Sequence, residues 1–247
     1  MNMIIREVEP YQLRKLIDQS GYAIAKNILD VKILNDIRST ILSEIETSKI
    51  SDSVVWSPYI GENNKLTYSN DEFQCMYRGY VFPWNNENKL FNNVLSEVDT
   101  LRNLVFPEMG HATIGKYSTY SVYRNNEGFL KGHKDSISSD VSVFQFIVPL
   151  SDKGSDFEEG GLYIIDSTGE KINIDEKIGL GDILFFDGRY EHGVDLVKGS
   201  GVGRIQMFSI PTNFIRPEDS PRLLDQISTR KFLRHKIRNL RNRWKRK

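Results

Sequence analysis

Two stretches in the first half of the chain carry apolar residues at helical spacing. In residues 30–49 the apolar positions recur every three or four residues, at Ile33, Leu34, Ile37, Ile41, Leu42 and Ile45. Residues 88–106 show the same spacing, at Leu90, Phe91, Val94, Leu95, Val98, Leu101 and Leu104. Each stretch predicts an amphipathic helix with one buried face, and Asp30 is placed to cap the first helix.

The segment between these two helices has no sustained period. Residues 50–86 are polar and rich in aromatic side chains, among them Trp56, Tyr68 and Trp84. Long connections of this kind inside a compact domain often close over a binding site. The segment is therefore interpreted as a lid.

From about residue 112 the pattern changes to that of β-strands. Short runs of β-branched and aromatic residues alternate with clusters of Gly, Asp, Ser and Asn. The runs are residues 113–124, 141–150, 161–166, 170–174, 182–188, 192–197 and 204–214. So many short strands indicate a β-sandwich or barrel, and helices followed by strands predict an α+β protein whose antiparallel double sheet is braced on one face by N-terminal helices.

Composition fits a soluble, globular protein of one domain. The 247 residues are 39% hydrophobic and 27% charged, and no apolar run approaches the roughly 18 residues of a membrane span. The N-terminus carries acidic residues where a signal peptide would be basic and then apolar, so we expect a cytoplasmic protein. Cys75 is the only cysteine, so a metal site would need nitrogen and oxygen ligands.

Charge is distributed unevenly along the chain. Residues 230–247 hold ten of the 33 Lys and Arg and no acid, so this tail has a charge of about +10 and the remainder about −10. Apolar residues Leu233, Ile237, Leu240 and Trp244 would form one stripe on a basic C-terminal helix. Such a helix suits an anionic membrane surface or an acidic partner, and it could equally pack its stripe on the domain.

A histidine and an aspartate lie two positions apart in residues 128–140, between strand-like runs. On a strand, the side chains of His133 and Asp135 would point to the same side, about 6.6 Å apart, and could meet at one ion if the chain curls slightly. Alone, the pair is weak evidence, because a loop histidine beside a surface acid has the same pattern. Whether the two residues bind a metal depends on a third ligand.

A second histidine and an arginine strengthen the metal interpretation. His192 opens a later strand-like run, and Arg204 begins the next. Two imidazoles and one carboxylate on one face of an octahedron leave three positions open on a non-haem iron(II), as an oxygenase requires. Zinc prefers a closed tetrahedron or a single open position, so iron is the better assignment.

These residues resemble those of the iron(II)- and 2-oxoglutarate-dependent dioxygenases, in particular the prolyl-hydroxylase-like and phytanoyl-hydroxylase-like branches. The matching phrases are His133-Lys134-Asp135, EEGGLYIID, GDILFFDGRYEHGVDLV and GRIQMFSI, which follow the family's order over about a hundred residues. The resemblance implies a double-stranded β-helix core, also called a jelly-roll or cupin-like core. We expect one domain over residues 1–229, with a helical brace over 1–110 and the core over 111–216, followed by the tail 230–247.

The resemblance also implies a role for each site residue. His133, Asp135 and His192 would ligate Fe(II), and Arg204 would pair with the distal carboxylate of 2-oxoglutarate, the cosubstrate beside O2. Tyr123 matches a tyrosine near the cosubstrate in prolyl-hydroxylase-like relatives, although a tyrosine packed in a strand would look the same. Many relatives place a serine two residues after the arginine, whereas this chain has Gln206. Arg124, Gln145, Asp187 and Arg189 flank the expected site, but strand phase is not fixed by sequence.

The implied reaction is hydroxylation of an unactivated C–H bond, with decarboxylation of 2-oxoglutarate to succinate. An aromatic lid favours a small or carrier-linked metabolite as substrate, and the alternative enzyme is a peptidyl or prolyl hydroxylase acting on a protein. The alternative outside enzymes is a non-catalytic jelly-roll binding module. Nucleic acid is not expected, because GRIQMFSIP lacks the further arginine pattern of the DNA-alkylation-repair branch. Oligomeric state cannot be inferred from the sequence.

Overall fold

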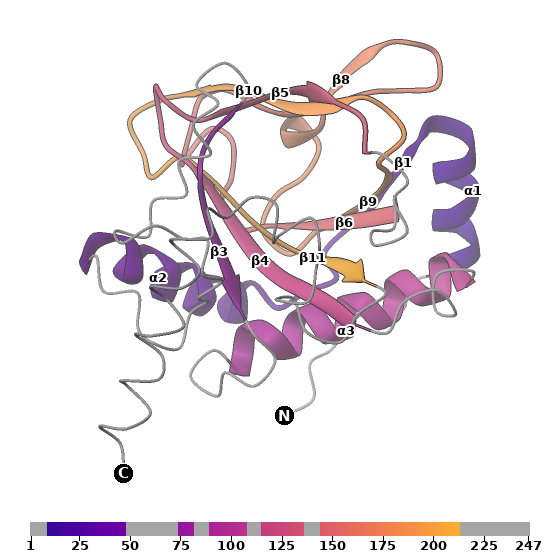
Figure 1. The fold of residues 1–247 in the computed structure, drawn as a ribbon, viewed down its shortest axis with the longest axis horizontal. Coiled ribbons are helices and arrows are strands. Elements are labelled where there is room, and N and C mark those ends of the chain that lie inside the picture. Colours follow the sequence, from indigo (N-terminus) through magenta and orange to yellow (C-terminus); the bar gives the residue numbers. More distant parts are fainter. Residues whose placement is uncertain (1–8, 48–73, 82–88, 108–114, 136–143, 213–247) are drawn as a thin grey trace, which may run out of the picture.

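The computed structural model describes residues 9–47, 74–81, 89–107, 115–135 and 144–212 (Figure 1). Within these residues the helices are α1 (Pro10–Ser20), α2 (Val31–Thr47) and α3 (Lys89–Val105), with a short 3-10 turn η1 (Ile174–Glu176). Asp30 caps α2 as expected, because its Oδ1 accepts a hydrogen bond from the backbone N–H of Lys32 at 2.8 Å. The two helices with clear periodicity are thus confirmed.

The strands of the described residues form two antiparallel sheets. The larger has the order β1-β9-β6-β11-β4-β3, and the smaller has the order β2-β5-β10-β7-β8. The strands of the larger sheet are β1 (Tyr22–Ala25), β3 (Tyr77–Val81), β4 (Gly115–Tyr123), β6 (Phe144–Pro149), β9 (Ile183–Asp187) and β11 (Arg204–Thr212). Those of the smaller are β2 (Gln74–Cys75), β5 (Phe129–His133), β7 (Glu159–Ile165), β8 (Lys171–Asn173) and β10 (His192–Lys198).

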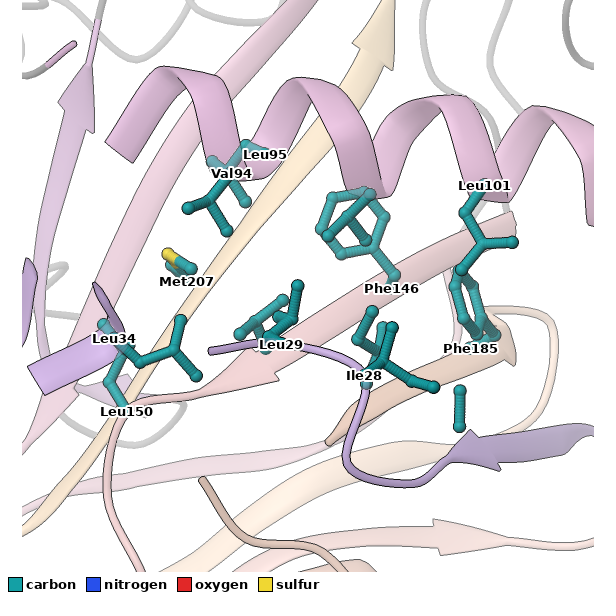
Figure 2. Close-up of a cluster of buried hydrophobic side chains, with 14 of the residues drawn as sticks. Ile28, Leu29, Leu34, Val94, Leu95, Leu101, Phe146, Leu150, Phe185 and Met207 are labelled. Atoms are coloured by element: carbon teal, nitrogen blue, oxygen red, sulfur yellow. The ribbon is translucent and has the colours of Figure 1, made fainter. Parts of the chain in front are cut away.

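The larger sheet is covered on both faces, which divides the hydrophobic core in two. On one face it packs against the helices; Figure 2 shows side chains of α3, such as Val94 and Leu95, on the same cluster as Phe146, Phe185 and Met207 of the sheet. On the other face it packs against the smaller sheet. Strand β9 serves both layers, since Phe185 belongs to the helix-side cluster and Phe186 to the cluster between the sheets. Two antiparallel sheets with N-terminal helices on one side confirm the predicted α+β sandwich.

The order of helices first and strands after is only partly correct. Strands β1, β2 and β3 lie in the N-terminal part, and they pair with β9, β5 and β4 respectively. Residues 74–81 therefore form strands of the two sheets, and not a lid as predicted. Short strands that pair with distant partners carry little local pattern, which explains the error. The other residues of the proposed lid and the basic tail lie outside the described residues.

One position of the predicted helix face is also wrong. Leu104 is 59% exposed, whereas Val105 and Phe106 are buried. The apolar stripe shifts there because 3.6 residues per turn drift away from a strict repeat of three and four. No helix among the described residues has both the length and the apolar character needed to cross a membrane.

Candidate metal centre

His133 is the last residue of β5, and a β-bulge sets its direction. His133 pairs with His192 on β10, and Leu130 pairs with Val194, so β5 has one extra residue between the two pairs. In a regular strand Leu130 and His133 would face opposite sides; the extra residue lets both point between the sheets. Gly132 lies in this bulge, where a Cβ would come within 2.6 Å of the Tyr163 hydroxyl and the Glu191 carboxylate.

Asp135 follows two residues later and is held by its backbone and its side chain. Its N–H donates to the carbonyl oxygen of Gly188 at 2.8 Å, which ties it to the turn before β10. Gln145 of β6 donates from its amide Nε2 to Asp135 Oδ2 at 2.5 Å. Asp135 is thus held to the larger sheet through its carboxylate and to the β9–β10 turn through its backbone.

His192 opens β10 beside these two residues. Its Nε2 lies 3.8 Å from Asp135 Oδ2, and its ring centroid lies 4.4 Å from that of His133. Burial lowers the pKa of His192 most, and the neighbouring His133 lowers it further. The Asp135 carboxylate acts in the opposite direction and raises this pKa, but its effect is smaller. A neutral imidazole is the form that binds metals, so this environment favours ligation.

The two histidines present the same nitrogen to the centre. His133 Nδ1 lies 3.1 Å from the carbonyl oxygen of Lys131, and His192 Nδ1 lies 3.0 Å from that of Tyr190. A carbonyl oxygen only accepts, so each Nδ1 carries the proton and each Nε2 offers a lone pair. Hydrogen bonds of this kind fix the tautomer and the ring orientation of metal-ligating histidines.

The three ligand atoms fit a divalent metal ion. One ligand atom from each of His133, Asp135 and His192 lies within 4.8 Å of the others. Atoms at neighbouring corners of an octahedron lie about 3 Å apart, so small side-chain rotations would close the set on one ion. Two nitrogens and one carboxylate oxygen suit non-haem iron(II) and leave positions for other ligands. The structure thus brings together the three residues that the sequence singled out.

Arg204 begins β11 and is 1% exposed. Its Nε donates to Asp175 Oδ2 at 2.5 Å and one terminal nitrogen, Nη2, donates to Asp175 Oδ1 at 3.1 Å. The other terminal nitrogen, Nη1, donates to the side-chain oxygen of Gln206. The guanidinium that was expected to meet the cosubstrate is therefore already paired with a carboxylate of the protein.

Tyr123 lies beside this arginine. It is fully buried at the end of β4, where it pairs with Arg204 across the sheet, and the Arg204 Cζ lies 5.7 Å from its ring centroid. Gln206, noted in the sequence as a departure from the serine of many relatives, is 5% exposed and accepts from Arg204. Arg204, Tyr123 and Gln206 form one buried group on neighbouring strands.

The structure shows which of the four flanking residues point to the metal centre, a question that the sequence did not settle. Gln145 reaches the metal centre through Asp135, whereas Asp187 pairs with Arg189 and the side chain of Arg124 is exposed. Asp175 was not anticipated. It lies in η1, 29 residues before its partner Arg204, in a polar stretch without a motif, so only a search for buried acids that match a buried arginine could have found it.

Sequence comparison assigns no relative to this chain. No protein-family model matches it, and no curated protein sequence matches it.

Several solved structures have the same fold. A prolyl-4-hydroxylase from Pseudomonas putida superposes with a TM-score of 0.62 and 11% identity, over 83% of this chain and 100% of that one. The non-haem α-ketoglutarate-dependent carbocyclase SnoK of nogalamycin biosynthesis has a TM-score of 0.59 and 11% identity, over 92% and 93%. The epimerase SnoN, in complex with Fe3+, α-ketoglutarate and nogalamycin RO, has a TM-score of 0.56 and 13% identity, over 87% and 88%. The structural neighbours of this chain are thus iron- and 2-oxoglutarate-dependent dioxygenases, and the chain has their fold.

Proposed function

We propose that this protein is an iron(II)- and 2-oxoglutarate-dependent dioxygenase that hydroxylates an unactivated C–H bond. The observation that carries the proposal is the convergence of His133, Asp135 and His192, with their ligand atoms within 4.8 Å, inside a fold shared with such enzymes. When bound, iron and 2-oxoglutarate would supply the oxidising power, with release of carbon dioxide and succinate. The protein supplies the placement.

Each residue of the site has a task in this proposal. Nε2 of His133, Nε2 of His192 and a carboxylate oxygen of Asp135 would hold the metal, while the Nδ1 atoms stay bonded to backbone carbonyls. Gln145 keeps Asp135 Oδ2 in place. The carboxylate of Asp135 also favours hydroxylation, because halogenating relatives resemble this family but carry a small residue at that position.

Arg204 is the proposed partner of the distal carboxylate of 2-oxoglutarate. A guanidinium stays charged at any physiological pH and offers N–H donors in a fixed plane. Tyr123 would line the same end of the site, since its ring lies beside the Arg204 guanidinium.

A small or carrier-linked metabolite is the proposed substrate class. SnoK and SnoN are both described as enzymes from nogalamycin biosynthesis, which is consistent with a small molecule. A peptide or protein substrate is the second candidate, because another neighbour is a prolyl hydroxylase from Trichoplax adhaerens in complex with a peptide fragment of hypoxia-inducible factor. Succinate formation over a panel of amino acids, nucleosides, saccharide precursors and proline peptides would separate the two.

The metal assignment is tested by ligand removal. His133→Ala or Asp135→Ala should abolish 2-oxoglutarate turnover and weaken Fe(II) binding, since a site of three anchors holds iron poorly with two. Asp195→Ala is the matched control, because Asp195 lies on β10, the strand that His192 opens, and pairs with Lys171 outside the metal centre. Full turnover in either ligand variant would refute the assignment.

The cosubstrate assignment is tested by anaerobic spectroscopy. Adding Fe(II) and 2-oxoglutarate without oxygen should give the weak visible charge-transfer band of the chelate. A protein that binds Fe(II) but shows no band would instead fit a non-catalytic jelly-roll binding module.

A further inference from the structure

The Asp175–Arg204 pair is buried deep in the sandwich. Asp175 is 6% exposed and Arg204 is 1% exposed, so both charges are shielded from water. Asp175 Oδ2 also accepts the backbone N–H of Leu162 at 2.6 Å. Charged groups in such surroundings need one another, because an unpaired buried charge is costly.

The backbone around Asp175 is shaped to receive its carboxylate. Gly161 has a φ of +103°, and a Cβ at that position would stand 2.3 Å from Asp175 Oδ2. A side chain at residue 161 would thus push the carboxylate away from Arg204. The second glycine of the Gly160-Gly161 phrase therefore makes room for this ion pair.

The pair lies beside the strand that runs past one of the candidate metal ligands. Ile164 of β7 is the partner of His192 on β10, and Leu162, which holds Asp175, is two residues along the same strand. Two residues of strand correspond to about 6.6 Å. In the proposed function, the distal carboxylate of a 2-oxo acid bound at the metal would reach Arg204.

The donors of Arg204 are largely in use. A guanidinium has five N–H donors. Among the described residues, Asp175 accepts from Nε and Nη2 and Gln206 accepts from Nη1, which leaves one N–H on each terminal nitrogen. A second carboxylate could bind only these two remaining N–H groups. Asp175 would then lie beside it, on the Nε side of the same guanidinium.

We infer that Asp175 is a resident counter-ion of the cosubstrate site, which orients Arg204 and weakens the binding of a dicarboxylate. This rests on the proposed function, because it assigns a role at the same site. Two carboxylates that share one buried guanidinium repel each other, and the repulsion is stronger in the interior than in water. Asp175 is thus a positioning residue, and it sets how strongly the site discriminates by charge.

The test is anaerobic titration of the Fe(II) protein with two 2-oxo acids, followed by the chelate absorbance. In Asp175→Asn the counter-charge is removed while the shape is kept, so the dissociation constant of 2-oxoglutarate should fall by about fivefold or more. Binding of 2-oxohexanoate, which has no distal carboxylate, should not change. The Fe(II) affinity should not change either.

Asp156→Asn is the matched control. Asp156 is also a buried carboxylate that pairs with both terminal nitrogens of an arginine, Arg38, and it accepts the backbone N–H of Asp152 at 2.9 Å. Its removal should lower the melting temperature as Asp175→Asn does, yet leave 2-oxoglutarate binding unchanged.

Unchanged or weaker 2-oxoglutarate binding in Asp175→Asn, or an equal change for both 2-oxo acids, would overturn the inference. The wild-type protein gives a second test that needs no variant: it should bind 2-oxoglutarate less than about tenfold more tightly than 2-oxohexanoate. A much larger preference would also overturn it. If neither wild type nor variant gives the band although Fe(II) binds, the proposed function fails; a band in the variant alone supports the counter-ion role.

Discussion

Gln145 and Asp135 share one short hydrogen bond at the candidate metal centre. Gln145 is 9% exposed on β6, and its amide nitrogen donates to Oδ2, the oxygen that also faces His192 Nε2. With one lone pair engaged by the amide, Oδ2 has another to offer to an ion. Gln145 therefore orients a ligand without being one.

We predict that Gln145→Leu weakens metal binding by about ten- to a hundredfold, the range typical of partners that orient metal ligands. Titration with Co(II), followed by its visible absorbance, would measure this. Gln19→Leu, which removes an exposed amide on α1, serves as the control. Equal affinity in wild type and Gln145→Leu would show that Asp135 is positioned by its backbone alone.

Single residues differ in how far sequence could identify them. His133, Asp135 and His192 could be singled out because, together with Arg204, they follow the order of motifs in a known family, although the His133–Asp135 pair alone is weak evidence. Gln145 could be placed only near the site, since its direction depends on the phase of β6 across from β9. Asp175 was missed, because a carboxylate in a polar stretch looks like any surface acid until folding buries it against Arg204.

Helix α3 shows how an element of this fold is held. Leu95 is fully buried in the cluster between α3 and the larger sheet (Figure 2). Leu104 on the same helix is 59% exposed. Because the two leucines lie on the same helix and differ in burial, a comparison of their substitutions measures the effect of burial.

We expect Leu95→Ala to lower the free energy of unfolding by about 2–5 kcal/mol, through lost burial and the cavity left behind. Leu104→Ala should change it by no more than about 0.5 kcal/mol. Urea denaturation of both variants measures this difference. Similar losses in the two would mean that α3 does not pack as described.

Strand β5 was not among the strand-like runs that the sequence predicted. Its five residues lie between two of those runs, yet they form the ladder that carries His133, with β2 on one side and β10 on the other. The bulge opposite His192 cannot be read from the residues, because it depends on the register between two strands about sixty residues apart.

At the scale of the whole molecule, the helical layer is tied to the sandwich by charge as well as by packing. Arg38 of α2 pairs with Asp156 in the loop before β7, and both side chains are largely buried. The helices are thus tied to the loop that precedes β7.

The basic tail is predicted to be dispensable for chemistry. Deleting residues 230–247 should leave Fe(II) and 2-oxoglutarate binding unchanged, because the metal centre and both core clusters of the described residues are formed upstream of it. Cosedimentation with vesicles of anionic lipid should decrease, since ten positive charges are removed. A truncated protein that does not fold would show instead that the tail packs on the domain.

The sequence by itself determined the fold class, the two amphipathic helices, most strands and the three candidate metal ligands, because periodicity and residue type are local properties of the chain. The tertiary structure alone decided which side chains meet: the bulge that directs His133, the amide of Gln145 on Asp135, and the carboxylate of Asp175 on Arg204. These contacts join residues from different strands and turns, and they depend on register, phase and burial, which exist only once the sheets have paired.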